Sequence, residues 1–417
     1  MSISQNFPNI DPTLRLNFQG ARRLDPRITF ERASIGTYVG ADGLIKYAAA
    51  DEARFDHDPL TGESLGLLIE QEGSNYFPNS QTLSDWVIDN ASLTTNTSET
   101  LSPDGSNNAL KLTATGSGVI QHDVVRFTGI NNYQQSTFSV WLKTASGNGH
   151  FQMSIGNVTY PGNASTGNLA VYGASVEEYP NGWFRFSIRR NWGAAVGGVT
   201  LGIHLNANSG NGGYGVIAPQ SFEQSGEALY IWGTQWENKQ SSSITTTYIP
   251  TSGSTVTRPE DNAYIIGTNF SSWFTPTEGS ILMNFKPNML SSTNGAILSF
   301  KNAANSPWPI YRFSGATENW WKWYNGNDGI VTIKNGFSNS LYKFGFAFNQ
   351  TNGSSAESGV LTQTDITALR VSTDYASSDR MNIGYAGTPG YTSTATINKL
   401  VFYPTRLTNT QLQELTQ

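Results

Sequence analysis

The sequence predicts an all-β protein, in which two β-sandwich domains follow a small β-rich N-terminal segment. Charged residues make up only 13% of the 417 residues, whereas aromatic residues reach 12% and glycines number 42. Aromatic, Thr and Ser residues favour pleated strands, and frequent Gly and Asn favour tight turns. Short strand patterns separated by such turns recur along the chain, which is typical of sandwiches rather than of helical or α/β proteins.

The N-terminal segment, residues 1–74, is predicted to consist of short strands and turns. Apolar residues alternate at Leu14, Leu16 and Phe18, which indicates a half-buried strand. Residues 38–45 hold an Asp-Gly pair between two apolar stretches, and this Gly can supply the positive φ of a hairpin turn. We expect this segment to serve as an attachment or packing unit against a neighbour.

Residues 75–261 are predicted to form a jelly-roll sandwich. Its strand-like stretches are separated by turn sequences such as Ser102-Pro103-Asp104-Gly105. The predicted strands are Ala109–Thr113, Phe138–Lys143, Phe151–Ile155, Trp183–Ile188, Thr200–His204 and Leu229–Trp236. We expect the large aromatic residues of these strands, including Trp141, Trp183 and Trp232, to form the core of this sandwich.

Residues 262–417 are predicted to form a second, lectin-like sandwich. The predicted strands are Gly279–Phe285, Ala296–Phe300, Ile310–Phe313, Trp320–Tyr324, Ile330–Ile333, Tyr342–Asn349 and Lys399–Tyr403. Near the end of the chain, Thr408 or Asn409 can cap a short helix in which Leu412 and Leu415 share one side.

Composition excludes several classes of function. The net charge of −6 and the scattered Lys and Arg residues argue against nucleic acid as a partner. The chain has no cysteine, so disulfides and thiolate metal sites are excluded. Its first residues lack the features of a signal peptide, and no apolar stretch is long enough to span a bilayer. We therefore expect synthesis in a cytoplasm without export and no membrane insertion.

Four stretches of the first 80 residues resemble the N-terminal segment of many tailed-bacteriophage virion proteins. They are Arg27–Ser34, Ala41–Leu44, Ala53–Glu70 and Asn75–Ser80. The region after them is similar to carbohydrate-binding-module-like jelly rolls, through motifs such as Phe138–Lys143 and Leu229–Glu237. The last domain resembles a concanavalin-A-like or laminin-G-like fold, with Lys399–Tyr403 and Leu407–Leu415 as its clearest parts.

The resemblance implies a virion component of the tail fibre, spike or baseplate appendage type that binds host surface carbohydrate. Its implied partners are other virion proteins, a host surface glycan and further copies of the same chain, with a trimer favoured. The implied location is the virion, after synthesis in the host cytoplasm. A purely architectural capsid fibre, cement or connector protein is the alternative, because one fold of this kind serves many roles.

The sequence predicts neither a catalytic site nor a metal site. It contains no nucleophile elbow, HExxH helix, phosphate-binding loop or EF-hand loop. His57 between Asp56 and Asp58 could bind a cation, but a polar turn before Asp58-Pro59 explains these residues. We expect a non-enzymatic protein without a cofactor. A polysaccharide depolymerase is the third alternative, because a carboxylate pair assembled by the fold is invisible in sequence.

The best binding candidate is an aromatic run in the last domain. Its residues are Trp320, Trp321, Trp323 and Tyr324, with Trp308 shortly before them. On a strand, Trp321 and Trp323 face one way and Trp320 and Tyr324 the other. One set could stack on sugar rings while the other packs in the core, or both could be buried. Oxygen atoms of the following turn, 325–329, could coordinate a structural calcium ion, although their spacing does not single out such a site.

Overall fold

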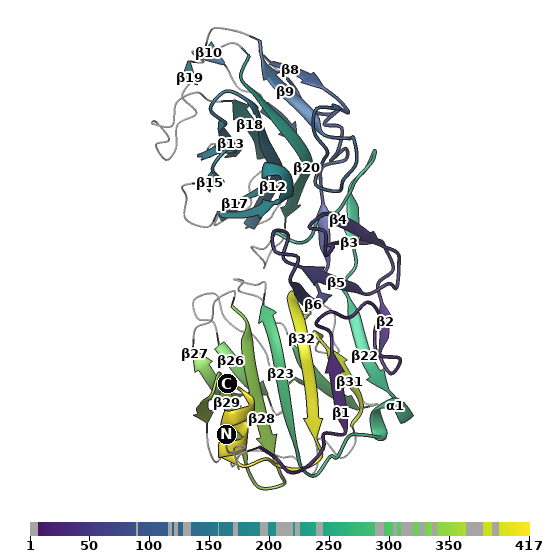
Figure 1. Ribbon diagram of the computed structural model, residues 1–417. Helices are drawn as coiled ribbons and strands as arrows, with labels where there is room; N and C mark the ends of the chain where they lie inside the picture. Colours follow the sequence, from purple (N-terminus) through teal and green to yellow (C-terminus); the bar gives the residue numbers. More distant parts are fainter. Residues whose placement is uncertain are drawn as a thin grey trace.

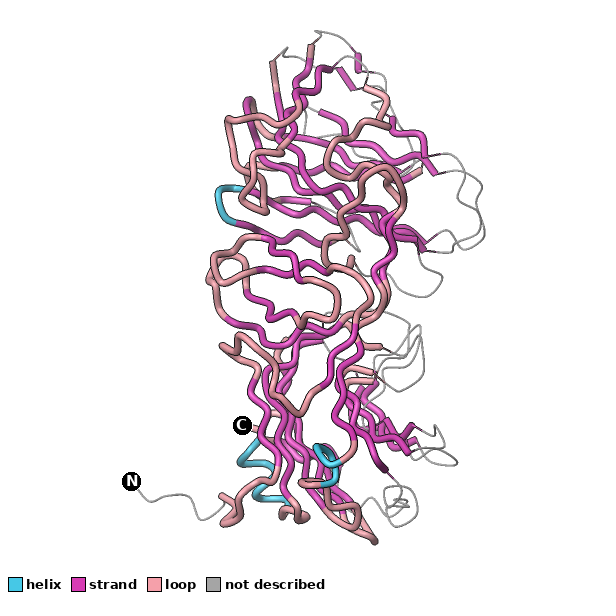
Figure 2. Tube along the Cα trace, turned by 90° about the vertical axis from the view of Figure 1, so that its right-hand side faces the viewer, coloured by secondary structure: helices cyan, strands magenta, loops and turns pink. Residues whose placement is uncertain are grey.

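The protein is almost entirely β-structure, which confirms the predicted all-β, multi-sandwich fold. Figures 1 and 2 show an elongated molecule with two bodies of strands, and Figure 1 shows a narrower region between them. The computed structural model describes residues 7–88, 91–115, 119–120, 124–127, 135–156, 158–169, 174–191, 199–205, 220–221, 226–238, 245–287, 296–302, 307–309, 320–324, 330–335, 340–363, 378–385 and 392–417. The predicted strand 310–313 and the turn 325–329 lie outside these residues.

The composite sandwich, at the bottom of Figure 1, consists of two sheets that draw on both ends of the chain. Its eight-stranded sheet contains β1 (Leu14–Asn17), β5 (Arg54–His57), β6 (Ser64–Ile69), β23 (Gly279–Pro287), β28 (Tyr342–Phe348), β29 (Gly353–Glu357), β30 (Val360–Gln363) and β32 (Ala395–Tyr403). Its five-stranded sheet contains β2 (Thr29–Glu31), β22 (Asn262–Ile266), β24 (Leu298–Asn302), β25 (Pro307–Pro309) and β31 (Ser378–Ile383).

The N-terminal segment supplies four strands to this sandwich. Strand β1 pairs antiparallel with β32, and the predicted alternation holds because Leu14 and Leu16 are buried while Arg15 and Asn17 are exposed. Strands β5 and β6 extend the same sheet beyond β32, and β2 pairs with β22 of the other sheet. Residues 1–74 and 262–417 were expected to form separate structural units, but they are separate only along the sequence. In space, the two stretches share one hydrophobic core.

Glycine at position 66 allows β6 to approach β32 closely. Gly66 has a φ of +95°, and a Cβ atom added there would lie 2.3 Å from the carbonyl oxygen of Ile397. A larger residue would therefore force β6 away from β32, which explains why Gly stands inside the apolar run 65–70.

The second sandwich, at the top of Figure 1, is formed by the middle of the sequence, between β7 (Gly73–Asn75) and β21 (Val256–Arg258). We call it the middle sandwich. Its six-stranded sheet contains β8 (Ala91–Thr94), β9 (Leu110–Ala114), β12 (Gln135–Ser146), β16 (Ser175–Tyr179), β17 (Trp183–Asn191) and β20 (Ala228–Asn238). Its five-stranded sheet contains β11 (Val124–Phe127), β13 (His150–Ile155), β14 (Val158–Asn163), β15 (Asn168–Leu169) and β18 (Val199–Leu205).

The remaining elements are two-stranded ribbons and short helical turns. The ribbons are β3 (Gly36–Val39) with β4 (Ile45–Ala48), β7 with β21, β10 (Val119–Ile120) with β19 (Gln220–Ser221), and β26 (Trp320–Tyr324) with β27 (Ile330–Asn335). The helical elements are α1 (Thr268–Ser271), α3 (Asn409–Leu415) and the 3₁₀ turn η1 (Pro180–Gly182). No helix in the described part of the chain is long and apolar enough to cross a membrane.

Helix α3 confirms the prediction for the C-terminus. The Thr408 side chain accepts a hydrogen bond from the Gln411 backbone amide, and the Gln411 side chain accepts one from the Thr408 amide, which forms a capping box. Leu412 is buried with Leu282 and Val401 against the outer face of the eight-stranded sheet. The helix thus shields apolar residues that the sandwich core does not reach.

The predicted Asp-Gly hairpin is the ribbon β3–β4, and it docks on the middle sandwich. Trp141, Trp183 and Trp232 are 0–1% exposed, as expected, but they lie in a separate core with Ile45 of this ribbon. The predicted burial is therefore confirmed, but the three tryptophans pack in this separate core and not in the larger core of the middle sandwich, where Phe184 and Phe186 lie. Alternation along a strand tells which residues share a face, and it does not tell what covers that face.

Candidate functional site

A buried charge cluster joins the two sandwiches, and Arg54 of β5 lies at its centre. The Arg54 guanidinium donates to Glu70 Oε2 at 2.7 Å and to Asp261 Oδ2 at 2.5 Å. It also donates to the carbonyl oxygen of Thr37 at 2.8 Å and to Thr247 Oγ1 at 3.0 Å. Both ion pairs are at most 2% exposed. Arg54 therefore ties β5, β6, the β3–β4 ribbon and the segment around Asp261 together.

Two further arginines complete this charge cluster, which comprises Arg32, Arg54, Glu70, Arg258 and Asp261. Arg32 donates to Asp261 Oδ1 at 3.3 Å, and Arg258 lies 3.5 Å from Glu70 Oε2. Arg32 also donates to the carbonyl oxygen of Ala49 at 2.7 Å, and Arg258 to that of Gln71 at 2.6 Å. The arginines thus bind backbone carbonyls as well as carboxylates, which fixes their orientation.

Burial and pairing have opposite effects on the ionisation of this cluster. Burial favours a neutral Glu70, but the guanidinium groups of Arg258 and Arg54 and two hydrogen bonds from Thr247 outweigh it and lower the pKa of Glu70 to about 2. Burial also disfavours a charged Arg54, yet Asp261 and Glu70 raise the pKa of its guanidinium above the ordinary value. Glu70 and Arg54 are therefore both charged at neutral pH.

Residues 246–251 form a strap between the β3–β4 ribbon and the middle sandwich. The Thr247 amide donates to Glu70 Oε1 at 2.8 Å. The carbonyl oxygen of Tyr248 accepts from Thr37 Oγ1 at 2.6 Å, and the Tyr248 hydroxyl lies 2.7 Å from Ser80 Oγ. Residues 37–80 and 246–251 are far apart in sequence, and these bonds bring them together.

Such a cluster positions segments more than it adds net stability. Removing charges from water costs several kcal/mol per ion, and pairing roughly repays that cost. A misplaced segment would leave one of these charges buried without a partner, which is strongly unfavourable. The cluster therefore selects one arrangement of the two sandwiches.

The Asp56-His57-Asp58 sequence at the end of β5 serves the local backbone. Asp56 Oδ1 accepts from the Val39 amide at 2.8 Å, and His57 Nδ1 lies 3.1 Å from the Val39 carbonyl oxygen. Asp58 Oδ1 accepts from the amides of Leu60 and Thr61, which confirms the predicted polar turn. No group of three or more His, Asp or Glu side chains in the described ranges could hold a metal ion.

Asp56 should make stability depend on pH. Burial raises the pKa of its partly buried carboxyl from 3.8 to about 7, opposed by the Val39 hydrogen bond and by Arg54, with a smaller rise from Glu70 and Glu177. A raised folded-state pKa means that the native state holds the proton longer, so stability falls as pH rises between these two values. We expect Asp56→Asn to flatten the curve of unfolding free energy there. Solvent screening reduces the expected change to about 2 kcal/mol.

Urea unfolding at a series of pH values measures this effect, and Asp58→Asn is the matched control. Hydrogen bonds from Thr61 lower the pKa of Asp58, so this carboxylate stabilises the fold above its ordinary pKa of 3.8. The control should be less stable than the wild type at neutral pH, yet keep the decline between pH 3.8 and about 7. An equal decline in Asp56→Asn and the wild type would refute the assignment.

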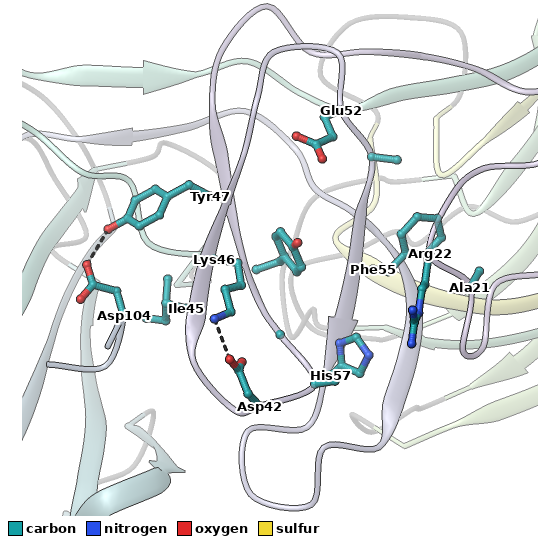
Figure 3. Close-up of a pocket in the computed structure, with 14 residues that line it drawn as sticks. Ala21, Arg22, Asp42, Ile45, Lys46, Tyr47, Glu52, Phe55, His57 and Asp104 are labelled. Atoms are coloured by element: carbon teal, nitrogen blue, oxygen red, sulfur yellow. Dashed lines mark hydrogen bonds and ion pairs between the residues drawn. The ribbon is translucent and has the colours of Figure 1, made fainter. Parts of the chain in front are cut away.

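An open pocket of about 750 Å³ is lined by residues of the β3–β4 ribbon and of β5 (Figure 3). Its lining includes Arg22 from the loop after β1, Tyr38 and Lys46 from the ribbon, Glu52 from the following loop, and His57 from β5. Lys46 donates to Asp42 Oδ2 at 2.6 Å, so these two charges neutralise each other. Within the described residues, neither the Arg22 guanidinium nor the Tyr38 hydroxyl makes a hydrogen bond. Sequence alone gave no sign of this pocket, because its walls come from separate segments.

The predicted aromatic run forms a strand, as expected. It is β26, which pairs with β27, and Trp308 lies in β25, which pairs with β24. The side chains of Trp308, Trp320, Trp321, Trp323 and Tyr324 lie outside the described part of the structure. The choice between a stacking face and a buried face therefore stays a prediction.

Comparison with known proteins gives only distant likeness. No protein-family profile matches the chain, and no curated protein matches it. A Trypanosoma rangeli sialidase in complex with the inhibitor DANA superposes with a TM-score of 0.31 at 15% identity, over 38% of this chain and 27% of that chain. The NanB sialidase from Streptococcus pneumoniae gives 0.30 at 12% identity, over 37% and 26%. The match thus spans about a quarter of the length of these sialidases.

A shorter protein gives a similar result. The CBM40 of the Ruminococcus gnavus IT-sialidase, bound to α2,3 sialyllactose, superposes with a TM-score of 0.28 at 16% identity, over 34% of this chain and 83% of that chain. Likeness at these scores carries no information about the activity or ligand of the present protein.

Proposed function

We propose that this chain is a non-enzymatic structural protein of a tailed-bacteriophage particle that projects from the particle and binds host surface carbohydrate. The observation that carries the structural half is the buried charge cluster. Through the bonds of Arg54 and Glu70 to Thr247, it links the composite sandwich to the segment 246–251 on the middle sandwich, within one elongated body. Three of its five residues lie in the stretches that resemble phage virion proteins. Such a body suits an appendage that holds a binding surface away from the particle.

Assembly is part of the proposal. By resemblance, the chain forms a homo-oligomer, with a trimer favoured, and binds other virion proteins. Many copies on one particle would turn weak binding of single sugars into firm attachment. The carbohydrate half of the proposal rests on the aromatic strand β26 and on the resemblance of the middle sandwich to carbohydrate-binding modules.

Glycan binding by the purified full-length chain tests the proposal. We expect binding to a subset of surface polysaccharides on an array, without release of reducing ends. Trp320→Ala and Trp321→Ala should differ in effect, because neighbouring residues of a strand face opposite sides and only the exposed side can stack on sugar. Absence of binding at high protein concentration would refute the carbohydrate half, and reducing-end release would refute the non-enzymatic half.

A purely architectural role is the second candidate, and one observation favours it. The residues that carry the phage-like resemblance include Arg32, Arg54 and Glu70, whose side chains are buried in the junction and cannot touch a host surface. A connector needs only that rigid junction. Localisation by electron microscopy would favour it if both sandwiches were covered by other virion proteins.

A further inference from the structure

The open pocket beside the β3–β4 ribbon has walls held in place by contacts with both sandwiches. The Ile45 amide donates to the carbonyl oxygen of Pro103 in the middle sandwich at 2.9 Å. Gly43 at the ribbon tip is so close to Pro180 and Pro59 that an added Cβ would lie 2.6 Å and 2.3 Å from their atoms. On the opposite wall, β5 belongs to the composite sandwich. The pocket is therefore preorganised, which lowers the entropic cost of binding.

The lining combines ring surfaces with polar groups of both kinds. Tyr38 contributes an aromatic ring, Arg22 and Tyr38 contribute uncommitted donors, and Glu52 contributes a carboxylate. One Glu52 oxygen, Oε2, accepts from the Ala49 amide at 2.7 Å, which fixes the side chain and leaves Oε1 for a ligand. Sugars present apolar C–H faces together with hydroxyls that both donate and accept, so this lining matches a saccharide. The pocket volume of about 750 Å³ is within the range of small-molecule sites.

The charge of the lining indicates which class of sugar fits. Among the lining residues, the carboxylates of Asp42, Glu52 and Asp104 outnumber the cations Arg22 and Lys46. Lys46 is already paired with Asp42, so Arg22 is the one uncommitted cation among the described lining residues, and Glu52 opposes it. An anionic sugar would meet a net negative wall, whereas the hydroxyls of an uncharged sugar can accept from Arg22 and donate to Glu52 without that repulsion.

We propose that this pocket is a carbohydrate-binding site, distinct from β26, that takes one uncharged sugar unit of a host surface polysaccharide. The sugar ring packs against Tyr38, and its hydroxyls lie between Arg22 and Glu52. This proposal rests on the proposed carbohydrate-binding function and assigns a site to it.

Calorimetric titration of the full-length protein tests the assignment. The probes are oligosaccharides of glucan, galactan and mannan as uncharged ligands, and oligogalacturonate as the anionic one. We expect binding of at least one uncharged probe, weakened at least tenfold by Arg22→Ala and by Tyr38→Ala. Arg23→Ala is the matched control, because Arg23 is exposed next to Arg22 but does not line the pocket. The affinity of this variant for the probe should equal that of the wild type.

The possible outcomes separate the two proposals. Unchanged affinity in both Arg22→Ala and Tyr38→Ala, with a binding wild type, overturns the pocket assignment and leaves the proposed function standing. Binding of oligogalacturonate alone overturns the assignment to uncharged sugars. A wild type that binds no probe here and no glycan on the array overturns both. Arg22 is exposed, so its replacement should leave the unfolding midpoint unchanged and loss of binding will not reflect loss of fold.

Discussion

Replacing Arg54 with methionine is expected to lower the free energy of unfolding by about 4 kcal/mol. Methionine fills a similar volume without charge, so the change leaves Glu70 and Asp261 buried without their shortest ion pairs, at 2.7 and 2.5 Å. The remaining partners, Arg258 and Arg32, lie farther away, at 3.5 and 3.3 Å. Breaking a buried pair from one side typically costs about 3–5 kcal/mol, because the uncompensated charge stays buried.

Urea unfolding followed by tryptophan fluorescence measures this loss, and Arg15→Met is the matched control. Arg15 also pairs with an aspartate, Asp11, but the two side chains are 64% and 100% exposed. Exposed pairs contribute about 0–1 kcal/mol, so the control should remain close to the wild type. Because Arg54 links both sandwiches, we also expect its loss to separate their unfolding into two transitions. Equal stability of the two variants would contradict the role given to the cluster.

Local sequence signals predicted the elements of this fold well. Alternation at Leu14 and Leu16 gave β1 and its buried face, because side chains on a strand alternate strictly. The capping residues predicted helix α3, and the Asp-Gly pair predicted the turn between β3 and β4. Each of these features depends on interactions within a few residues, which sequence displays directly.

Assembly of the elements depended on contacts that sequence does not display. The pairing of Leu14 with Phe402 and the bond between Arg54 and Asp261 join residues hundreds of positions apart. A buried arginine also resembles a surface arginine in sequence, so Arg54 gave no signal of its role. The sequence of the aromatic run was enough to predict a strand. Which of its two faces is exposed depends on the sheets that pack against it, and the sequence does not display these contacts. For the same reason the pocket at Arg22 and Tyr38 was not foreseen.

The composite sandwich leads to the second large prediction: the fragment 262–417 should not fold by itself. It lacks β1, β2, β5 and β6, which leaves β32 and β22 without neighbours on one side. The shared core would also lose the buried residues Leu14, Leu16, Phe18, Ile28, Phe30, Phe55, Leu67 and Ile69. Burial of one such side chain contributes about 1.5–3 kcal/mol, so the eight together contribute about 12–24 kcal/mol. This is comparable to or larger than the roughly 5–15 kcal/mol that stabilises a typical domain.

A chain in which a short Gly-Ser linker replaces residues 76–255 is the matched control. Asn75 and Val256 are partners in the β7–β21 ribbon, so a few residues can join them while every strand of the composite sandwich is kept. This variant loses the Thr247 bonds to Glu70 and should unfold at a lower urea concentration than the wild type, but in one cooperative transition. The fragment 262–417 should show neither a cooperative transition nor dispersed amide resonances. Native-like dispersion of the amide resonances in that fragment would mean that residues 262–417 form a complete sandwich without the first 74 residues. Dispersion in the linker variant alone would mean that the N-terminal strands are part of the fold, and that the middle sandwich is an insertion between its two halves.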